Sequence, residues 1–299
     1  MKNPKLSVVI LSFNTKESLR NCLLSLSKVR DEVDFEVIVP DNGSIDGSPE
    51  MVEKEFPWVK KVLKIGKNLG FAAGNNIALR SINSEFVLLL NPDTIVFPKT
   101  IKRVLDYMKE NNKVGAATCK VQLPSGKLDY SCHRGFPTPW NSLCYFSGIS
   151  KLFPNSKYFS GYTASYQNLD QTHEIDALTG AFALIRTKAG QAVQWFDEDY
   201  FWNGEDIDFC YKLKAKGWKI VYIPAVKITH FKGSASGLNK SGKGRPDKLI
   251  KKKAAFSSTQ VMRLFYKKNL AKKYPFFIDW LVYLGIYLME IFRVTKSSI

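Results

Sequence analysis

The sequence predicts an α/β protein whose mostly parallel sheet is covered by helices on both faces. The strongest signal is the apolar run from Phe86 to Leu90, which is too short for a typical helix and is typical of a strand buried on both faces. Short strand patterns also alternate with helical patterns through residues 6–118, the order of a doubly wound, Rossmann-like sheet. With 299 residues, 45% of them hydrophobic, the chain can bury a large core.

The elements of the first half follow one another at short spacing. Asn14 and Glu17 have the spacing of a capping box, and Ser48 with Pro49 is typical of an N-cap and the first turn of a helix. We expect strands at residues 6–13, 35–39, 58–65, 86–90 and 114–118, and helices around residues 19–26, from residue 48, up to residue 79 and at residues 100–111.

The second half is less regular. Prolines and aromatic side chains punctuate residues 120–171, and a stretch of this length without clear elements is usually a functional loop or lid. We expect a strand at 180–186, a helix from Gly204 to Gly217, a last strand at 218–223 and a loop at 226–233 that contains His230. We expect a Rossmann-like nucleotide-binding half at 1–118 and a second half at 119–235 to form one domain, followed by a tail at 236–299.

The tail differs in composition from the rest of the chain. The net charge is +17, and the segment from Lys240 to Lys273 is dense in Lys and Arg with one acid, Asp247, which favours an anionic partner. We expect a Gly/Ser/Lys loop at 234–244, a basic helix at 246–270 and an apolar helix at 276–292, whose charge-free part is too short to span a membrane. The helices either lie in an anionic membrane interface or pack on the body, as a homodimer interface for example.

Cysteines and the N-terminal residues bear on location. The five cysteines show neither close pairing nor zinc-ligand spacing, and we expect buried thiols in a reducing compartment. The first residues run straight into a strand pattern without the apolar region of a signal peptide. We therefore expect a cytoplasmic protein, peripheral on the inner face of the cell membrane.

Polar side chains recur where the predicted strands end. Pro92 cannot donate to a sheet ladder, so its strand should stop and leave Asp93 at the carboxyl end. Asp41 and Asn68 follow two other strands, and Glu205 with Asp206 begins a helix. Ligands of open α/β sheets bind beyond the carboxyl ends of the strands. Each signal alone also fits a turn or a helix start, but together they suggest a site for a nucleoside diphosphate, a divalent cation and a general base.

These motifs also resemble a known family. Their order is similar to that of family 2 glycosyltransferases of the GT-A type, and most similar to the rhamnosyltransferase-like branch. The resemblance covers about residues 5–235. It rests on Val8-Val9-Ile10-Leu11-Ser12-Phe13-Asn14, Asp41-Asn42-Gly43-Ser44-Ile45-Asp46-Gly47-Ser48, Asn68-Leu69-Gly70-Phe71-Ala72-Ala73-Gly74-Asn75-Asn76, Asn91-Pro92-Asp93, Gly180-Ala181-Phe182, Gly204-Glu205-Asp206-Ile207-Asp208 and His230.

The resemblance implies a role for each matching residue on the donor side. Asp41 would contact the base or ribose of the nucleotide, with Ser12 and Asn14 near the same pocket. Asn68, Gly70 and Asn75 would line the nucleotide-sugar side. The donor would be a dTDP- or UDP-linked sugar.

For the chemical step the resemblance implies a metal and a base. Asp93 would bind Mg²⁺ or Mn²⁺ bridging the diphosphate, and His230 would be a further metal or diphosphate contact. Asp206 would be the catalytic base of an inverting displacement, with Glu205 orienting it or holding the acceptor. Asn91 stands where the family's Asp-x-Asp motif has its first acid, which loses a carboxylate from the donor site.

The expected function is transfer of a sugar, rhamnose for example, from a nucleoside diphosphate to a glycan or polyprenyl-linked acceptor in cell-surface polysaccharide synthesis. Because Asn91 replaces an acid, the alternative is a catalytically impaired homologue that binds nucleotide sugars. A dehydrogenase is disfavoured, since Gly66, Gly70 and Gly74 lack the G-x-G-x-x-G spacing. A nucleic-acid binder would explain the basic tail but not the acids at the strand ends, and we expect no nucleic-acid partner.

Overall fold

The computed structural model describes residues 5–201, 203–233 and 248–298. Its strands are β1 (Leu6–Val9), β2 (Phe35–Asp41), β3 (Lys61–Lys64), β4 (Phe86–Leu90), β5 (Thr94–Val96), β6 (Val114–Gln122), β7 (His173–Glu174), β8 (Phe182–Arg186) and β9 (Lys219–His230). Its α-helices are α1 (Lys16–Ser27), α2 (Ser48–Glu55), α3 (Gly70–Leu79), α4 (Thr100–Glu110), α5 (Pro139–Phe146), α6 (Ile149–Leu152), α7 (Thr187–Ala192), α8 (Glu205–Ala215), α9 (Lys248–Asn269) and α10 (Phe276–Ser298).

The predicted fold class is confirmed, with a sheet that is mixed in detail. In the described residues the strand order is β3-β2-β1-β4-β8-β6-β9-β5, with β7 paired to β9. The pairs β1–β2, β1–β4, β2–β3 and β6–β9 are parallel, whereas β8 runs antiparallel to β4 and β6. Strand β4 is buried along its whole length, as its apolar run predicts.

The register brings the strand ends to one edge of the sheet. Val9 of β1 lies opposite Ile38 of β2 and Leu89 of β4, and Ser12 forms an isolated parallel bridge with Asp41. Because these three strands are parallel, their carboxyl ends share an edge. The loops that follow them are therefore neighbours, although they are far apart in the sequence.

Two expectations about the second half are wrong. The loop expected at 226–233 is mostly strand, because β9 continues to His230 and pairs with β5, which the sequence analysis did not predict. The region 120–171 is not a single irregular loop, since it contains the end of β6, the helices α5 and α6 and a 3-10 turn at Tyr130–Cys132. Pro139 at the first turn of α5 and the Thr138 side chain, which accepts a hydrogen bond from the Asn141 N–H, start that helix.

The predicted caps in the first half are also wrong in detail. Helix α1 begins at Lys16, and Asn14 has a positive φ of 53° and accepts a hydrogen bond from the Ile45 N–H instead of capping the helix. Helix α2 begins at Ser48 itself, with Gly47 as its N-cap residue. Both differences arise because the polar groups near these helix starts form hydrogen bonds with the Asp41–Ser48 loop.

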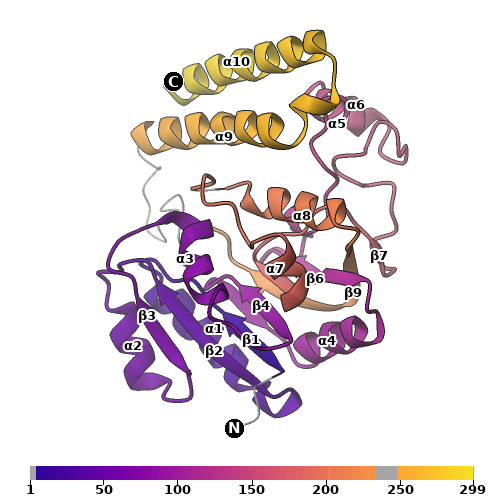
Figure 1. Ribbon diagram of the computed structural model, residues 1–299. Helices are drawn as coiled ribbons and strands as arrows, with labels where there is room; N and C mark the ends of the chain where they lie inside the picture. The colour runs from indigo at the N-terminus through magenta and orange to yellow at the C-terminus, as the bar shows by residue number, and fades with distance from the viewer. Residues whose placement is uncertain (1–4, 202, 234–247, 299) are drawn as a thin grey trace.

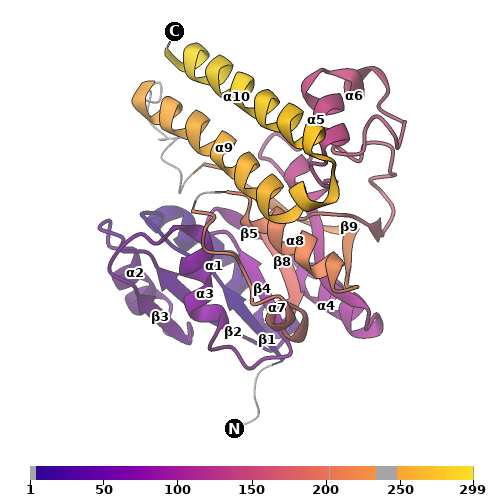
Figure 2. The same cartoon turned by 45° about the horizontal axis from the view of Figure 1, so that its top comes forward.

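The C-terminal helices form a hairpin that lies against the body on the side opposite the N-terminus (Figures 1 and 2). Helix α9 packs on α8, and α10 packs on α9. The loop expected at 234–244 lies outside the described residues. Among the described helices, none is long and apolar enough to cross a membrane. All five cysteines are buried free thiols, as expected.

Candidate active site

The loop after β2 forms the first part of the site. The carboxylate of Asp41 accepts hydrogen bonds from the N–H groups of Gly43 and Ser44, at 3.1 and 2.8 Å, and from the Ser44 hydroxyl at 2.6 Å. The Asn14 N–H donates to the same Ser44 hydroxyl at 2.9 Å. Asp41, Ser12 and Asn14 therefore converge on one turn beyond β1 and β2.

The start of α3 lies next to this turn. Asn68 accepts a hydrogen bond from the Gly70 N–H at 2.9 Å, and Asn42 donates to the Gly70 carbonyl at 3.0 Å. Gly70 has a φ of +84°, and a Cβ atom there would lie 2.5 Å from the carbonyl oxygen of Phe201. Only glycine fits this conformation and close approach. Asn75 is buried and donates to the Phe71 carbonyl one turn earlier in the helix.

A second cluster forms where β4, β5 and β9 meet. The His230 ring places Nε2 3.2 Å from a carboxylate oxygen of Asp93 and Nδ1 3.2 Å from one of Asp129. Lys232 also contacts Asp129, at 2.8 Å, and the Asn91 amide lies 3.4 Å from His230 Nε2. The Phe231 N–H donates to the Asp93 carbonyl, so pairing of β9 with the chain after β4 fixes the cluster.

Hydrogen bonds within this cluster shift the pKa values of His230 and Asp129. Burial alone lowers the pKa of His230, but the hydrogen bonds to Asp129 and Asp93 outweigh it and raise the pKa to about 9. Burial alone would raise the pKa of Asp129, but hydrogen bonds from His230, Lys232 and Ser131 hold it below its ordinary value. The buried His230 ring therefore lies between the Asp93 and Asp129 side chains, with Lys232 bonded to Asp129 at the rim of the cluster.

We tested whether these residues fit a divalent cation. Among the residues that the structure describes, no group of three His, Cys, Asp or Glu side chains converges as a metal site. Mg²⁺, however, is usually held by one or two carboxylates together with substrate phosphates. Asp93, with 6% of its surface exposed, and the Asn91 amide supply such oxygen donors at the strand end. The donor set fits a cation that shares its coordination with a diphosphate.

The third part of the site is the start of α8. Arg134 donates through Nη2 to Asp206 at 2.7 Å and to the Leu178 carbonyl at 3.1 Å. Burial opposes the charge of Arg134, but Asp206 raises the pKa of the guanidinium above its ordinary value. Burial, reinforced by the Asp206 charge, raises the pKa of the Glu205 carboxyl. Its Oε2 atom is buried and has no hydrogen-bond partner in the described part of the chain.

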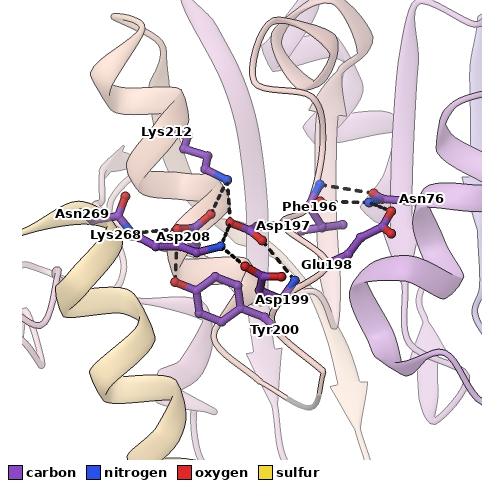
Figure 3. A network of polar contacts seen from close by, with 10 residues as sticks. All are labelled: Asn76, Phe196, Asp197, Glu198, Asp199, Tyr200, Asp208, Lys212, Lys268 and Asn269. Atoms are coloured by element: carbon purple, nitrogen blue, oxygen red, sulfur yellow. Dashed lines mark hydrogen bonds and ion pairs between the residues drawn. The ribbon is translucent and has the colours of Figure 1, made fainter.

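The loop before α8 is held on both sides (Figure 3). On one side Asn76 of α3 donates to the Phe196 carbonyl and to Glu198, both at 2.9 Å. On the other side Lys268 of α9 bonds Asp197 and Asp199 at 2.6 and 2.5 Å. Asn269, Lys212 and Tyr200 likewise converge on the buried Asp208 of α8. This network fixes the loop that leads to Glu205 and Asp206 of α8 relative to α3 and α9.

The second and third parts meet through the start of β8. Leu90 of β4 pairs with Phe182, and the Asn91 N–H donates to the Ala181 carbonyl at 3.3 Å. Leu178, which accepts from Arg134, is three residues before Ala181. The first and third parts meet where the Phe71 N–H donates to the Phe201 carbonyl. All three parts thus surround the same edge of the sheet, while a separate hollow beside Arg80, Phe196 and Lys212 contains none of the predicted site residues.

Asp129 and Arg134 belong to the site but are not predicted from the sequence. Both lie in the region 120–171, which the sequence analysis treats only as a loop. Their partners His230 and Asp206 are 101 and 72 residues away in the chain. No local pattern marks a buried Asp or Arg of this kind, although two charged residues among Leu128, Tyr130 and Phe136 could have prompted a search for partners.

Sequence comparisons relate the chain to known proteins. Residues 4–247 match the family described as "Glycosyltransferase like family 2". The chain is 27% identical over 244 residues to the N-acetylglucosaminyl-diphospho-decaprenol L-rhamnosyltransferase of Mycobacterium tuberculosis, covering 78% of each chain. It is 25% identical over 242 residues to the rhamnosyltransferase WbbL of Escherichia coli, covering 75% of this chain and 82% of that one.

Solved structures share the fold. The mannosyltransferase PcManGT of Pyrobaculum calidifontis, in complex with GDP-Man and Mn²⁺, superposes with a TM-score of 0.58 at 16% identity, covering all of this chain and 74% of that one. TarS of S. aureus superposes with a TM-score of 0.56 at 17% identity, covering 97% of this chain and 81% of that one. At these sequence identities the likeness shows a shared fold, namely the GT-A arrangement of sheet and helices.

Proposed function

Because the chain belongs to glycosyltransferase family 2 and is a nucleotide-sugar dependent transferase, we propose that it is an inverting enzyme of cell-surface polysaccharide synthesis. It transfers a sugar from a dTDP- or UDP-linked donor to a glycan or polyprenyl-linked acceptor. The sugar that we favour is rhamnose. The observation that carries the proposal is the position of Asp206, held by Arg134 at the sheet edge where Asp93 and Asp41 also lie. The names of the two rhamnosyltransferase relatives support the choice of sugar.

In this proposal the donor lies along the ends of β1, β2 and β4. Asp41, with Ser12 and Asn14 beside it, binds the base or ribose. Asn68, Gly70 and Asn75 line the nucleotide-sugar side. Asp93, with Asn91 and His230 next to it, would hold Mg²⁺ or Mn²⁺, which when bound neutralises the charge of the diphosphate.

The chemical step needs a base on the other side of the sugar. The Asp206 carboxylate accepts the proton of the acceptor hydroxyl as that oxygen attacks the anomeric carbon. The bond from this carbon to the diphosphate breaks on the opposite face, so the configuration inverts and the nucleoside diphosphate leaves. Arg134 orients Asp206, and the Glu205 carboxyl, whose pKa burial and Asp206 raise, can donate a hydrogen bond to the acceptor.

A polyprenyl-linked acceptor places the reaction at a membrane. We therefore propose that the protein works from the cytoplasm, peripheral on the anionic inner face of the cell membrane. The decaprenol in the name of the Mycobacterium tuberculosis relative supports this class of acceptor. The basic and apolar composition of the tail supports the location.

A thermal-shift panel of nucleotide sugars, with and without Mn²⁺, tests the proposal. One class of nucleoside-diphosphate sugar should raise the melting temperature, and Mn²⁺ should increase the shift. Stabilisation by NAD alone, or by no nucleotide, would contradict the proposal.

The second candidate, an impaired homologue, is favoured by Asn91 in place of an acid. It predicts donor binding without release of nucleoside diphosphate in the presence of acceptor glycans.

A further inference from the structure

The outer face of α10 and the α5–α6 segment expose apolar side chains to a degree that a folded body does not explain. We propose that together they form one docking surface for an anionic lipid bilayer, fixed rigidly to the Arg134–Asp206 pair. The proposal deepens the proposed function and rests on it only where it assigns the surface a role in presenting a lipid-linked acceptor.

Helix α10 directs its acids inward. Tyr266 of α9 donates to Asp279 at 2.6 Å, and Thr259 and Arg263 of α9 both donate to Glu290 at 2.7 Å. Asp279 and Glu290 are the only acids in the sequence of α10. The two carboxylates that interrupt this apolar stretch are thus hydrogen-bonded to α9. The face turned away from α9 carries no carboxylate.

The outer face of α10 is apolar along most of its length. Phe276 is 84% exposed and Trp280 63% exposed, and the exposure continues to Ile291 at 45%. At about 1.5 Å per residue this face is roughly 22 Å long. Contiguous apolar surfaces of this size mark an interaction site. The other exposed apolar side chains of this face are Phe277, Leu281, Leu284, Tyr287 and Leu288.

The α5–α6 segment adds a second group of exposed apolar residues. Leu152 is 75% exposed and Phe153 51% exposed, and Leu143 and Tyr158 are exposed as well. Figures 1 and 2 both place α5 and α6 beside the helical hairpin. The guanidinium of Arg293 in α10 lies 5.8 Å from the centre of the Phe146 ring, within the range of a cation–π contact. The two groups are therefore joined.

The composition of this surface favours lipid over a second copy of the chain. Trp and Tyr side chains suit the level of the headgroups, because each has an apolar body and a polar group, and Phe and Leu side chains suit the apolar layer just below. Exposed lysines accompany both groups, Lys151 and Lys157 near α6 and Lys267 and Lys272 near the turn before α10. A symmetric dimer through this face would bring these like charges together, whereas an anionic bilayer attracts them.

A chain of aromatic contacts joins the surface to the proposed base. Phe136, two residues after Arg134, packs on Tyr211 of α8 with ring centres 5.0 Å apart. Tyr211 packs in turn on Phe265 of α9 at 5.7 Å. Docking would therefore hold Asp206 at a fixed height above the headgroups, where the sugar of a polyprenyl-linked acceptor lies.

Vesicle co-sedimentation of the full chain tests the proposal. The wild type should sediment with vesicles of equal parts phosphatidylcholine and phosphatidylglycerol, and less with phosphatidylcholine alone. Leu288→Glu in α10 and Leu152→Glu in α6 should each weaken partitioning roughly tenfold, because each removes an exposed apolar side chain that docking on the bilayer would bury. Leu24→Glu on α1, where Leu24 is 45% exposed, is the matched control and should partition like the wild type.

Two results would overturn the proposal. One is a wild-type chain that stays in the supernatant with the anionic vesicles. The other is a dimer in sedimentation velocity that Leu288→Glu dissociates, with no vesicle binding by the wild type. Transfer to a water-soluble acceptor is measured separately. Vesicle binding without transfer would refute the proposed function and leave the docking surface supported.

Discussion

The Nη2 atom of Arg134 lies 2.7 Å from the Oδ2 atom of Asp206, and both side chains are largely shielded from solvent. A second bond to the Leu178 carbonyl fixes the guanidinium, so the carboxylate has one orientation at the start of α8. A general base needs its charge and its direction at the moment of proton transfer. We therefore regard Arg134 as a positioning residue that acts through Asp206.

Replacing Arg134 by Lys should lower kcat roughly 10- to 100-fold while leaving the Kd of the donor nearly unchanged. Lysine keeps the charge but loses the planar fork that orients the carboxylate and reaches Leu178 at the same time. Arg134→Met should also lower the free energy of unfolding by about 3–5 kcal/mol, because it leaves a shielded carboxylate unpaired. Kinetics and donor titration with the Lys variant separate orientation from folding.

Arg20→Lys is the matched control for this substitution. Arg20 pairs with Glu17 and Glu55 on the surface, where ion pairs contribute little. This variant should keep the wild-type kcat and melting temperature. If Arg134→Lys behaves like Arg20→Lys, the positioning role is wrong.

Asp206→Asn should reduce transfer by about 10²- to 10⁴-fold, the range expected for loss of a general base, while donor binding remains measurable. Glu205→Gln is the comparison. Because burial and Asp206 raise the pKa of Glu205, its carboxyl is a hydrogen-bond donor that glutamine resembles, and we expect a smaller loss. Full activity in Asp206→Asn would reject the assignment of the base.

Asp93→Ala should weaken the binding of nucleoside diphosphate in Mn²⁺ by about tenfold or more, since it removes the carboxylate of the proposed cation site. Isothermal titration with Mn²⁺ and with EDTA measures this effect. The difference between variant and wild type should shrink in EDTA. An affinity that the substitution leaves unchanged in Mn²⁺ would place the cation elsewhere.

The sequence predicts those parts of the site that local sequence patterns determine. The apolar run of β4 and the proline after it place Asp93 at a strand end, and the start of α8 places Asp206 on the first turn of a helix. Asp129 and Arg134 could not be found in this way, because their roles depend on distant partners. The end of β9 was missed for the same reason, since it is a strand only through its pairing with β5.

The tail shows the same limit. Its two helices follow from composition and periodicity, but Asp279 and Glu290 appear in the sequence only as interruptions of an apolar stretch. Their bonds to α9 turn an apparently mixed helix into one with an apolar outer face. Only the packing of α9 against α10 decides which side each charge occupies.

Gly204→Ala should destabilise the protein by about 2–4 kcal/mol, combining backbone strain and overpacking. Gly204 has a φ of +91°, and a Cβ atom would lie 2.4 Å from Cγ1 of Val261 in α9. Gly217→Ala is the matched control, because Gly217 has a φ of +81° with nothing within 4 Å of its Cβ position. It should cost only about 1–2 kcal/mol of strain.

Denaturant unfolding of both glycine variants measures the difference, which reports the packing of α9 on the residue before Glu205. Adding Val261→Ala to Gly204→Ala should recover the part of the lost unfolding free energy that comes from overpacking. The part that comes from backbone strain should remain. Equal losses in the two glycine variants would mean that α9 does not press on the start of α8.

His133 should make the protein less stable in mild acid. Its ring is fully buried with Nε2 2.6 Å from Nε2 of His173, and burial followed by repulsion from His173 lowers the pKa of His133 from 6.5 to about 4. Between these pH values His133 binds more protons in the unfolded chain than in the folded one. The contribution is therefore fully present above pH 6.5 and is lost as the pH falls toward 4, by up to about 1.4 kcal/mol per pH unit.

His133→Phe keeps a ring in place and removes this titration. Urea unfolding of wild type and variant across this range should give the variant the shallower acid dependence. Glu205 and His230, whose pKa values are raised, act in the opposite direction, because the stability that each contributes is lost as the pH rises. Both groups are present in the two proteins, so the difference between the slopes isolates His133. Parallel slopes would show that His133 titrates alike in the folded and unfolded chains.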